Sequence, residues 1–151
     1  MSCSHPSPNH NSRGNQSVQV IVLHADASPN ERGCLSWIQS SESKVSYHVL
    51  IGRDGKVYTC VPYDRRAWHA GKAEWNGNKD VNGISIGVSF SNRNDGVEAL
   101  TNAQIKAAQD VIADIRKRYG AELPVTTHAA VSPGRKSDPD KCPGFRLSDY
   151  A

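Results

Sequence analysis

VQVIVLHA, residues 18–25, is an almost unbroken run of apolar and mostly β-branched side chains. Such a run is typical of a strand that is buried on both faces of a sheet. We therefore expect it to be a central strand of an α/β fold. The run ends in His24, near the strand edge where α/β sheets usually carry their functional side chains.

Four other segments have the composition of strands. SYHVLIG (46–52) and KVYTCV (56–61) flank Arg53-Asp54-Gly55, and Asp-Gly favours the tight turn of a β-hairpin. GISIGVSF (83–90) is another run rich in Val and Ile, and VTTHAAV (125–131) is a last short run; both predict strands. The sheet should therefore contain several strands gathered around residues 18–25.

Two segments have the pattern of helices. CLSWIQS (34–40) places apolar residues one helical turn apart. Thr101 and Gln104 form a capping box ahead of a 3.6-residue apolar stripe that closes at Gly120. Strands and helices therefore alternate, which predicts an α/β fold: a single domain with a central mixed β-sheet flanked by helices.

Length, charge and hydropathy restrict the class of protein. The 151 residues suffice for one domain. Residues 1–17 are polar and predict an N-terminal arm packed on that domain, which spans residues 18–151. The formal charge of +3 comes without a dense basic stripe, so we expect no nucleic-acid partner. No apolar stretch approaches the roughly 20 residues that cross a bilayer, so we expect no membrane anchor.

The beginning of the chain and the cysteines bear on the compartment. The first residues, MSCSHPSPNHNSRGNQ, lack the apolar segment of a Sec signal peptide. Cys3, Cys34, Cys60 and Cys142 are widely spaced and include no Cys-x-x-Cys pair. Both observations favour synthesis in the reducing cytoplasm.

Three residues that are far apart in the chain have the chemistry of one metal site. His24 and His128 each follow an apolar run, and Asp138 lies ten positions beyond His128. Catalytic zinc commonly has three protein ligands of these types and leaves its fourth position to water. The sequence thus predicts a zinc hydrolase with His24, His128 and Asp138 as ligands.

The chain also resembles a known family over nearly its whole length. The segments that carry the resemblance, in the family's order, are SPNHNSRG, IVLHADAS, SYHVLIGRDGKVYTCV, AWHAGKAEW, NGISIGVSFSN and THAAVSPGRKSDP. They are similar to the zinc-dependent type 2 N-acetylmuramoyl-L-alanine amidases, which include phage lysozyme-type amidases and peptidoglycan recognition proteins. The resemblance implies hydrolysis of the amide between N-acetylmuramic acid and the L-alanine of the stem peptide in peptidoglycan.

The resemblance leaves two possibilities for the third ligand. Some members of the family use a cysteine in a Lys-x-Cys-Pro setting, and others use an aspartate in Arg-Lys-x-Asp-Pro. RKSDP (135–139) matches the second form and favours Asp138. CPGF (142–145) echoes the first form, so Cys142 is the alternative ligand, although its lysine directly precedes the cysteine.

The resemblance also implies catalytic residues. Tyr47 matches a family tyrosine that assists the attacking water or polarises the carbonyl, and Lys136 matches a lysine that stabilises the oxyanion. Some members place a glutamate where this chain has Ser89, which leaves the acid–base work to Tyr47.

Further residues are candidates for binding substrate. Trp68, His69 and Trp75 fall in the family's substrate-groove segment. Arg135 is suited to a stem-peptide carboxylate, because a guanidinium binds carboxylates through two hydrogen bonds.

The expected biological role is that of a phage endolysin, a monomer made in the host cytoplasm. In that role it is released to degrade the periplasmic cell wall, and so it is bacteriolytic and antimicrobial. The alternatives are a cytosolic muropeptide-recycling amidase and a non-catalytic module that binds peptidoglycan.

Overall fold

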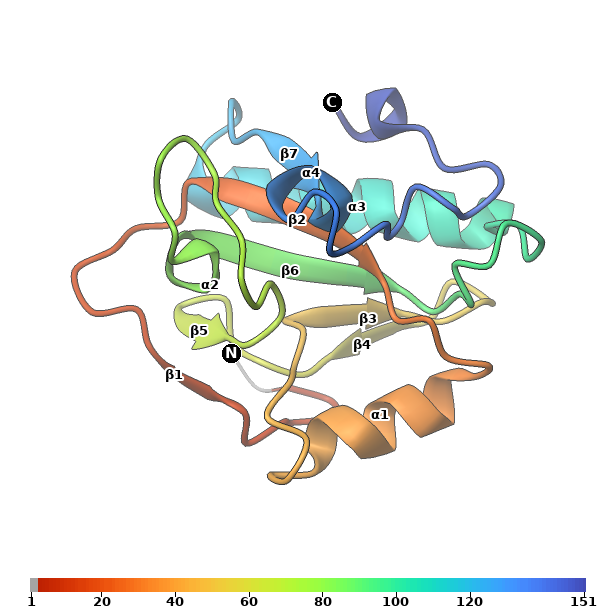
Figure 1. Ribbon diagram of the computed structural model, residues 1–151, viewed down its shortest axis with the longest axis horizontal. Helices are drawn as coiled ribbons and strands as arrows, with labels where there is room; N and C mark the ends of the chain where they lie inside the picture. The colour runs from red at the N-terminus through yellow and green to blue at the C-terminus, as the bar shows by residue number, and fades with distance from the viewer. Residues whose placement is uncertain (1–2) are drawn as a thin grey trace.

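The strand β2 (Val20–Ala25) lies inside a five-stranded sheet of order β4-β3-β6-β2-β7. The structure is a computed structural model that describes residues 3–151 (Figure 1). All six side chains of β2 are buried, and the strand pairs in parallel with β6 (Ser85–Phe90) on one side and β7 (Val125–Thr127) on the other. The apolar run thus forms a strand with neighbours on both sides, as its composition predicts.

A hairpin completes the other edge of the sheet. β3 (Val49–Ile51) pairs in parallel with β6 and antiparallel with β4 (Val57–Thr59), so the sheet is mixed. The turn between β3 and β4 contains Gly55 at φ +86°, where a Cβ atom would come within 2.9 Å of the carbonyl oxygen of Ala103. Glycine is required there for both its dihedral angle and its size.

Helices cover both faces of the sheet. In Figure 1, α3 (Asn102–Tyr119) runs behind the sheet and α4 (His128–Val131) lies in front of it. α1 (Glu31–Gln39) and α2 (Val81–Ile84) pack on the same face of the sheet as α4, opposite α3. The face against α3 is an apolar core made by alternate strand residues, among them Ile21, Leu23 and Ala25. Strand alternation directs His24 to the opposite face.

Helix α3 has the boundaries that its sequence predicts. Thr101 and Gln104 make both hydrogen bonds of a capping box, and the helix ends at Gly120, which has φ +130°. The last predicted strand is shorter than expected. β7 stops at Thr127 because the Thr127 side chain accepts a hydrogen bond from the amide of Ala130 and so starts α4.

The N-terminal segment lies against the domain through backbone carbonyl groups. The Asn9 side-chain amide donates to carbonyls at both ends of the 38–45 segment, and the Arg13 guanidinium donates to the carbonyls of Tyr63 and Gly83. Here β1 (His10–Ser12) pairs antiparallel with β5 (Arg65–Ala67) as a second, small sheet. Residues 1–2 of the predicted arm lie outside the described residues.

The C-terminus ends in a short 3-10 helix, η1 (Leu147–Tyr150). Within residues 3–151, the structure has no helix that is both long and apolar enough to cross a membrane.

Acid should destabilise the metal-free protein through a buried histidine. His48 accepts from the Gly87 amide at Nδ1 and donates from Nε2 to the carbonyl of Arg65, so the neutral ring is fully bonded. Burial lowers the pKa of His48 to about 3, against 6.5 in the unfolded chain. A folded pKa below the unfolded one means that unfolding takes up a proton. The contribution of the neutral His48 ring to the free energy of unfolding is fully present above pH 6.5. As the pH falls from 6.5 toward 3, this contribution decreases by up to about 1.4 kcal/mol per pH unit.

Denaturant titrations of the metal-free protein through this pH range measure the effect. The variant His48→Gln should show a shallower dependence, because glutamine can accept and donate at this position without titrating. A free energy of unfolding that stays constant as the pH falls below 6.5 would contradict the prediction.

Candidate metal centre

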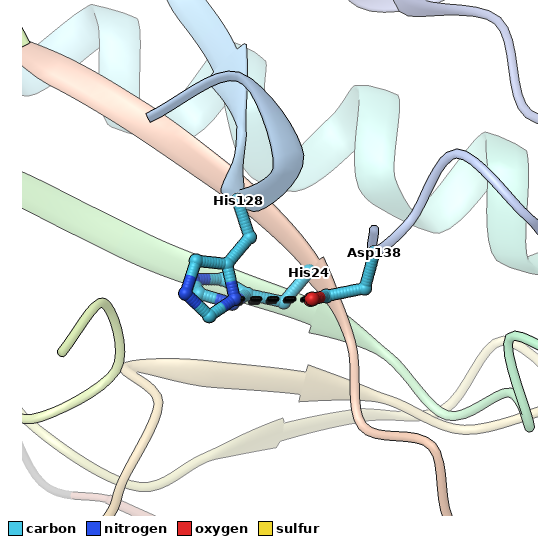
Figure 2. A group of neighbouring side chains, drawn as sticks. All are labelled: His24, His128 and Asp138. Carbon is cyan, nitrogen blue, oxygen red and sulfur yellow. Dashed lines mark hydrogen bonds and ion pairs between the residues drawn. The ribbon is translucent and has the colours of Figure 1, made fainter. Parts of the chain in front are cut away.

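His24 and His128 meet because two parallel strands are in register. Leu23 is paired with Thr127 across β2 and β7, and the residue that follows each of them at the carboxyl edge is a histidine: His24 in β2 and His128 at the start of α4. Asp138 reaches the same point from the loop that follows α4 (Figure 2). All three side chains are buried.

The distances in this cluster suit a small cation. His24 Nδ1 lies 3.1 Å from His128 Nδ1. The Asp138 carboxylate lies 3.1 Å from His128 Nδ1 through Oδ1 and 3.5 Å from His24 Nδ1 through Oδ2. Two nitrogen ligands of a tetrahedral zinc ion are expected about 3.3 Å apart, given metal–nitrogen distances near 2.0–2.1 Å. The donor set and its spacing therefore fit zinc.

Backbone amides hold Asp138 at this point. Its Oδ2 accepts from the amide of Ala25, which follows His24 in β2, at 3.1 Å. Its backbone carbonyl accepts from the amide of Ala129, which follows His128, at 2.9 Å. Asp138 is thus tied to the residue after each histidine.

The protonation states also favour a metal. Burial lowers the pKa of His24 to about 4, so its ring is neutral at pH 7. Burial by itself would raise the pKa of Asp138, but the neighbouring rings of His128 and His24 bring it below its ordinary value. An ionised carboxylate beside the neutral His24 ring favours a positive charge between them, and these two groups are in the forms that bind metal without losing a proton.

A cleft of about 860 Å³ opens onto the cluster. Tyr47, Trp68 and Lys136 line it, and the Tyr47 ring centroid lies 5.1 Å from that of His24. Burial raises the pKa of Tyr47 well above 10, so at neutral pH its hydroxyl is a hydrogen-bond donor. The structure therefore brings both predicted catalytic residues to a cleft that is also lined by His128 and Asp138.

Trp37 is a cleft residue that the sequence analysis missed. It lies on α1, lines the cleft and is 58% exposed. The signal was available, because the apolar stripe of α1 buries Leu35 and Ile38 and turns Trp37 away from them. An exposed tryptophan at the rim of a cleft offers a flat face to a sugar ring or an acyl chain.

Three residues predicted to bind substrate are engaged with the protein. His69 lies behind His24, with its ring nitrogens 2.8 Å from His24 Nε2 and 3.0 Å from Ser85 Oγ. The Arg135 guanidinium donates to the carbonyl of Ala70 at 2.6 Å and also to that of Lys72. Trp75 packs against the small apolar cluster that contains Val20 and Val22.

Cys142 lies apart from the metal cluster. It is 2% exposed and belongs to the apolar core on the α3 side of the sheet. Burial raises the pKa of its thiol to about 12, and the sulfur lies 3.7 Å from Asn94 Oδ1. Asp138, and not Cys142, completes the group of possible ligands with the two histidines.

Known amidases are similar to this chain in sequence. The sequence profile of the N-acetylmuramoyl-L-alanine amidase family matches residues 14–141. The chain is 30% identical over 153 aligned residues to the 1,6-anhydro-N-acetylmuramyl-L-alanine amidase AmpD of Citrobacter freundii, covering 89% of this chain and 81% of the relative.

Solved structures extend the likeness to the fold. A crystal structure of a selenomethionine derivative of AmpD has a TM-score of 0.77 at 28% identity, covering 99% of this chain and 97% of the other. Escherichia coli AmiD, in complex with the substrate anhydro-N-acetylmuramic acid-L-Ala-D-gamma-Glu-L-Lys, has a TM-score of 0.73 at 27% identity, covering 92% of this chain and 56% of the other.

The geometry predicts how two substitutions in the same loop will differ. Asp138→Ala should lower zinc affinity by more than about 100-fold, because it removes a ligand. Loss of a residue that only hydrogen-bonds to a ligand already lowers metal affinity about 10–100-fold. Cys142→Ser should leave zinc affinity unchanged, because the thiol lies in the apolar core. Competition of each metal-free protein with a chromophoric chelator measures both. The opposite pattern would move the third ligand to Cys142.

Proposed function

The chain belongs to the type 2 N-acetylmuramoyl-L-alanine amidase family, and from this membership we propose that it is a zinc-dependent, cytosolic muropeptide-recycling enzyme. It hydrolyses the amide between N-acetylmuramic acid and L-alanine in 1,6-anhydro muropeptides. The observation that carries the proposal is the buried group of His24, His128 and Asp138 beneath a cleft, in a chain that matches the family over residues 14–141. The catalytic unit in this proposal is residues 18–151, with residues 1–17 as an arm.

The relatives favour recycling over the endolysin role that we expected from the sequence. The Citrobacter freundii relative is named for the 1,6-anhydro form of the sugar, and the AmiD structure holds an anhydromuramyl peptide. The alignment with AmpD extends over most of both chains. We therefore assign this chain the small anhydro muropeptide as substrate.

The three buried ligands and the metal have separate tasks in this proposal. His24, His128 and Asp138 would hold zinc. When bound, zinc supplies a Lewis acid that polarises the amide carbonyl and makes water a stronger nucleophile at neutral pH. The cleft beside the ligands gives the scissile amide access to this group.

Tyr47 takes the place of an acidic residue that some family members carry. Ser89 is paired with His24 across β6 and β2, and its buried hydroxyl donates to the carbonyl of Phe90. No carboxylate occupies that strand position. We assign Tyr47 the donor role, because its protonated hydroxyl can bond the carbonyl oxygen as negative charge develops there. Lys136, which is exposed in the cleft, adds a positive charge near the same oxygen.

The cleft rim supplies the substrate contacts. Trp68 and Trp37 both line the cleft, and their rings are suited to the sugar and to apolar parts of the peptide. His69 and Arg135 hold protein groups in place, so we assign them support of the site.

The proposed activity is tested on two substrates. The purified protein is incubated with a 1,6-anhydro-N-acetylmuramyl tripeptide and, separately, with intact sacculi, each with and without a chelator. We expect metal-dependent release of a free peptide that begins with L-alanine, fastest from the anhydro muropeptide, with activity restored by added zinc. Metal-independent cleavage or none would contradict the amidase. Faster cleavage of sacculi would return the chain to a lytic role.

Removing one hydroxyl tests the role of Tyr47. Tyr47→Phe should lower kcat about 100-fold and change KM little, because the bond to the developing oxyanion forms only in the transition state. Tyr63→Phe serves as the control, since Tyr63 packs against the α3-side core away from the cleft. Steady-state kinetics on the anhydro muropeptide provide both constants. A Tyr47→Phe enzyme with wild-type kcat would remove Tyr47 from the mechanism.

A further inference from the structure

We infer that the consecutive residues His69 and Ala70 set the tautomers of both metal-ligand histidines, so that His24 and His128 each turn a bare Nδ1 toward the ion. This role presupposes the zinc site of the proposed function and makes His69 a positioning residue. The tautomer matters because a hydrogen on Nδ1 would occupy the position where the metal must bind. Two chains of hydrogen bonds, one from each of the adjacent residues, carry the assignment.

The direction of the first chain is decided at its far end. Ser85 donates its hydroxyl hydrogen to the carbonyl of Val81 at 2.6 Å, so Ser85 Oγ accepts from His69 Nε2 at 3.0 Å. A neutral imidazole carries one N–H, and His69 Nδ1 is therefore an acceptor. His24 Nε2, which lies 2.8 Å away, must donate to it. The single hydrogen of the His24 ring is thus on Nε2, and Nδ1 keeps its lone pair.

The second chain is shorter and reaches His128. The carbonyl of Ala70 lies 3.0 Å from His128 Nε2 and 2.6 Å from Arg135 Nη2. A carbonyl oxygen only accepts, so His128 Nε2 carries a hydrogen, and in the neutral, metal-binding form of the ring Nδ1 is then bare. Gly71 has φ +60°, and a Cβ atom there would lie 2.9 Å from Arg135 Nη2. Glycine therefore lets the guanidinium reach the carbonyl that it shares with His128.

Other residues of the protein hold His69 and Ala70 in position. Asn82 Oδ1 accepts from the backbone amides of both His69, at 3.1 Å, and Ala70, at 2.8 Å. On β6, Gly87 leaves the space that the imidazole fills, because a Cβ atom there would come within 2.5 Å of His69 Cγ. One asparagine and one glycine thus fix the dipeptide that orients both ligands.

A matched pair of variants separates hydrogen bonding from packing. Asparagine and leucine have the same number of side-chain heavy atoms and the same branching at Cγ, and only His69→Asn offers an acceptor near the position of Nδ1. Zinc affinity of each metal-free protein is measured by competition with a chromophoric chelator. We expect His69→Leu to weaken zinc binding about 10–100-fold and His69→Asn to remain within about threefold of wild type.

A second measurement needs no metal. Long-range proton–nitrogen NMR correlation on the metal-free proteins shows which nitrogen of His24 carries the hydrogen. We expect Nε2 in the wild type and in His69→Asn, and a mixture of tautomers in His69→Leu. A hydrogen on Nδ1 of His24 in the wild type would overturn the assignment. Equal zinc affinity in His69→Leu and wild type, or equal losses in both variants, would overturn it too.

The test also covers a His69→Leu variant that does not fold and a wild-type protein that binds no zinc. If His69→Leu does not fold, Ser85→Ala replaces it, because that change leaves the His69 ring in place and removes the hydroxyl that accepts from His69 and donates to the carbonyl of Val81. It should give a smaller loss of zinc affinity and a mixture of His24 tautomers, and no change in either would overturn the assignment. A wild-type protein that binds no zinc contradicts the proposed function, whereas the tautomer measurement tests the hydrogen-bond chain by itself.

Discussion

The parallel register between β2 and β7 is the constraint on which the site depends. With Leu23 opposite Thr127, the residue that follows each of them is a histidine, and the two Nδ1 atoms lie 3.1 Å apart. A slip of one residue would turn one of the histidines to the other face of the sheet and separate the pair. The register is strongly specified because the opposite face of β2 is packed against the apolar core over α3. The core that stabilises the fold therefore also sets the geometry of the ligands.

The two faces of the sheet have different tasks. The face against α3 is almost wholly apolar and supplies most of the burial that drives folding. The other face buries several histidines, which is costly unless every ring nitrogen has a partner. His48 and His69 have both nitrogens engaged, and His24 and His128 leave only their Nδ1 atoms facing Asp138. The two Nδ1 atoms and the Asp138 carboxylate therefore meet at one point, where a cation would be their partner.

Segment 68–71 connects the wall of the cleft to the two histidines of the proposed zinc site. Trp68 lines the cleft, while the next two residues bond to the Nε2 atoms of His24 and His128. Asn82 holds the two residues that follow Trp68, so the wall of the cleft and the supports of the two histidines are parts of one continuous segment.

The sequence alone determined the α/β class, the β3–β4 hairpin and the limits of α3, because periodicity, turn residues and caps are local properties of the chain. It also placed His24, His128 and Asp138 in one site, because the order of a family's motifs can be read directly along the chain. It did not determine that β7 would end at Thr127, that Cys142 would enter the α3-side core, or that His69 would lie behind a ligand. Those outcomes depend on strand register and loop path, which bring together residues more than forty positions apart. The sequence also did not determine the choice between muropeptide recycling and cell lysis, because the same metal ligands serve both roles. Only the tertiary structure decided which side chains touch, because hydrogen bonds form between neighbours in space.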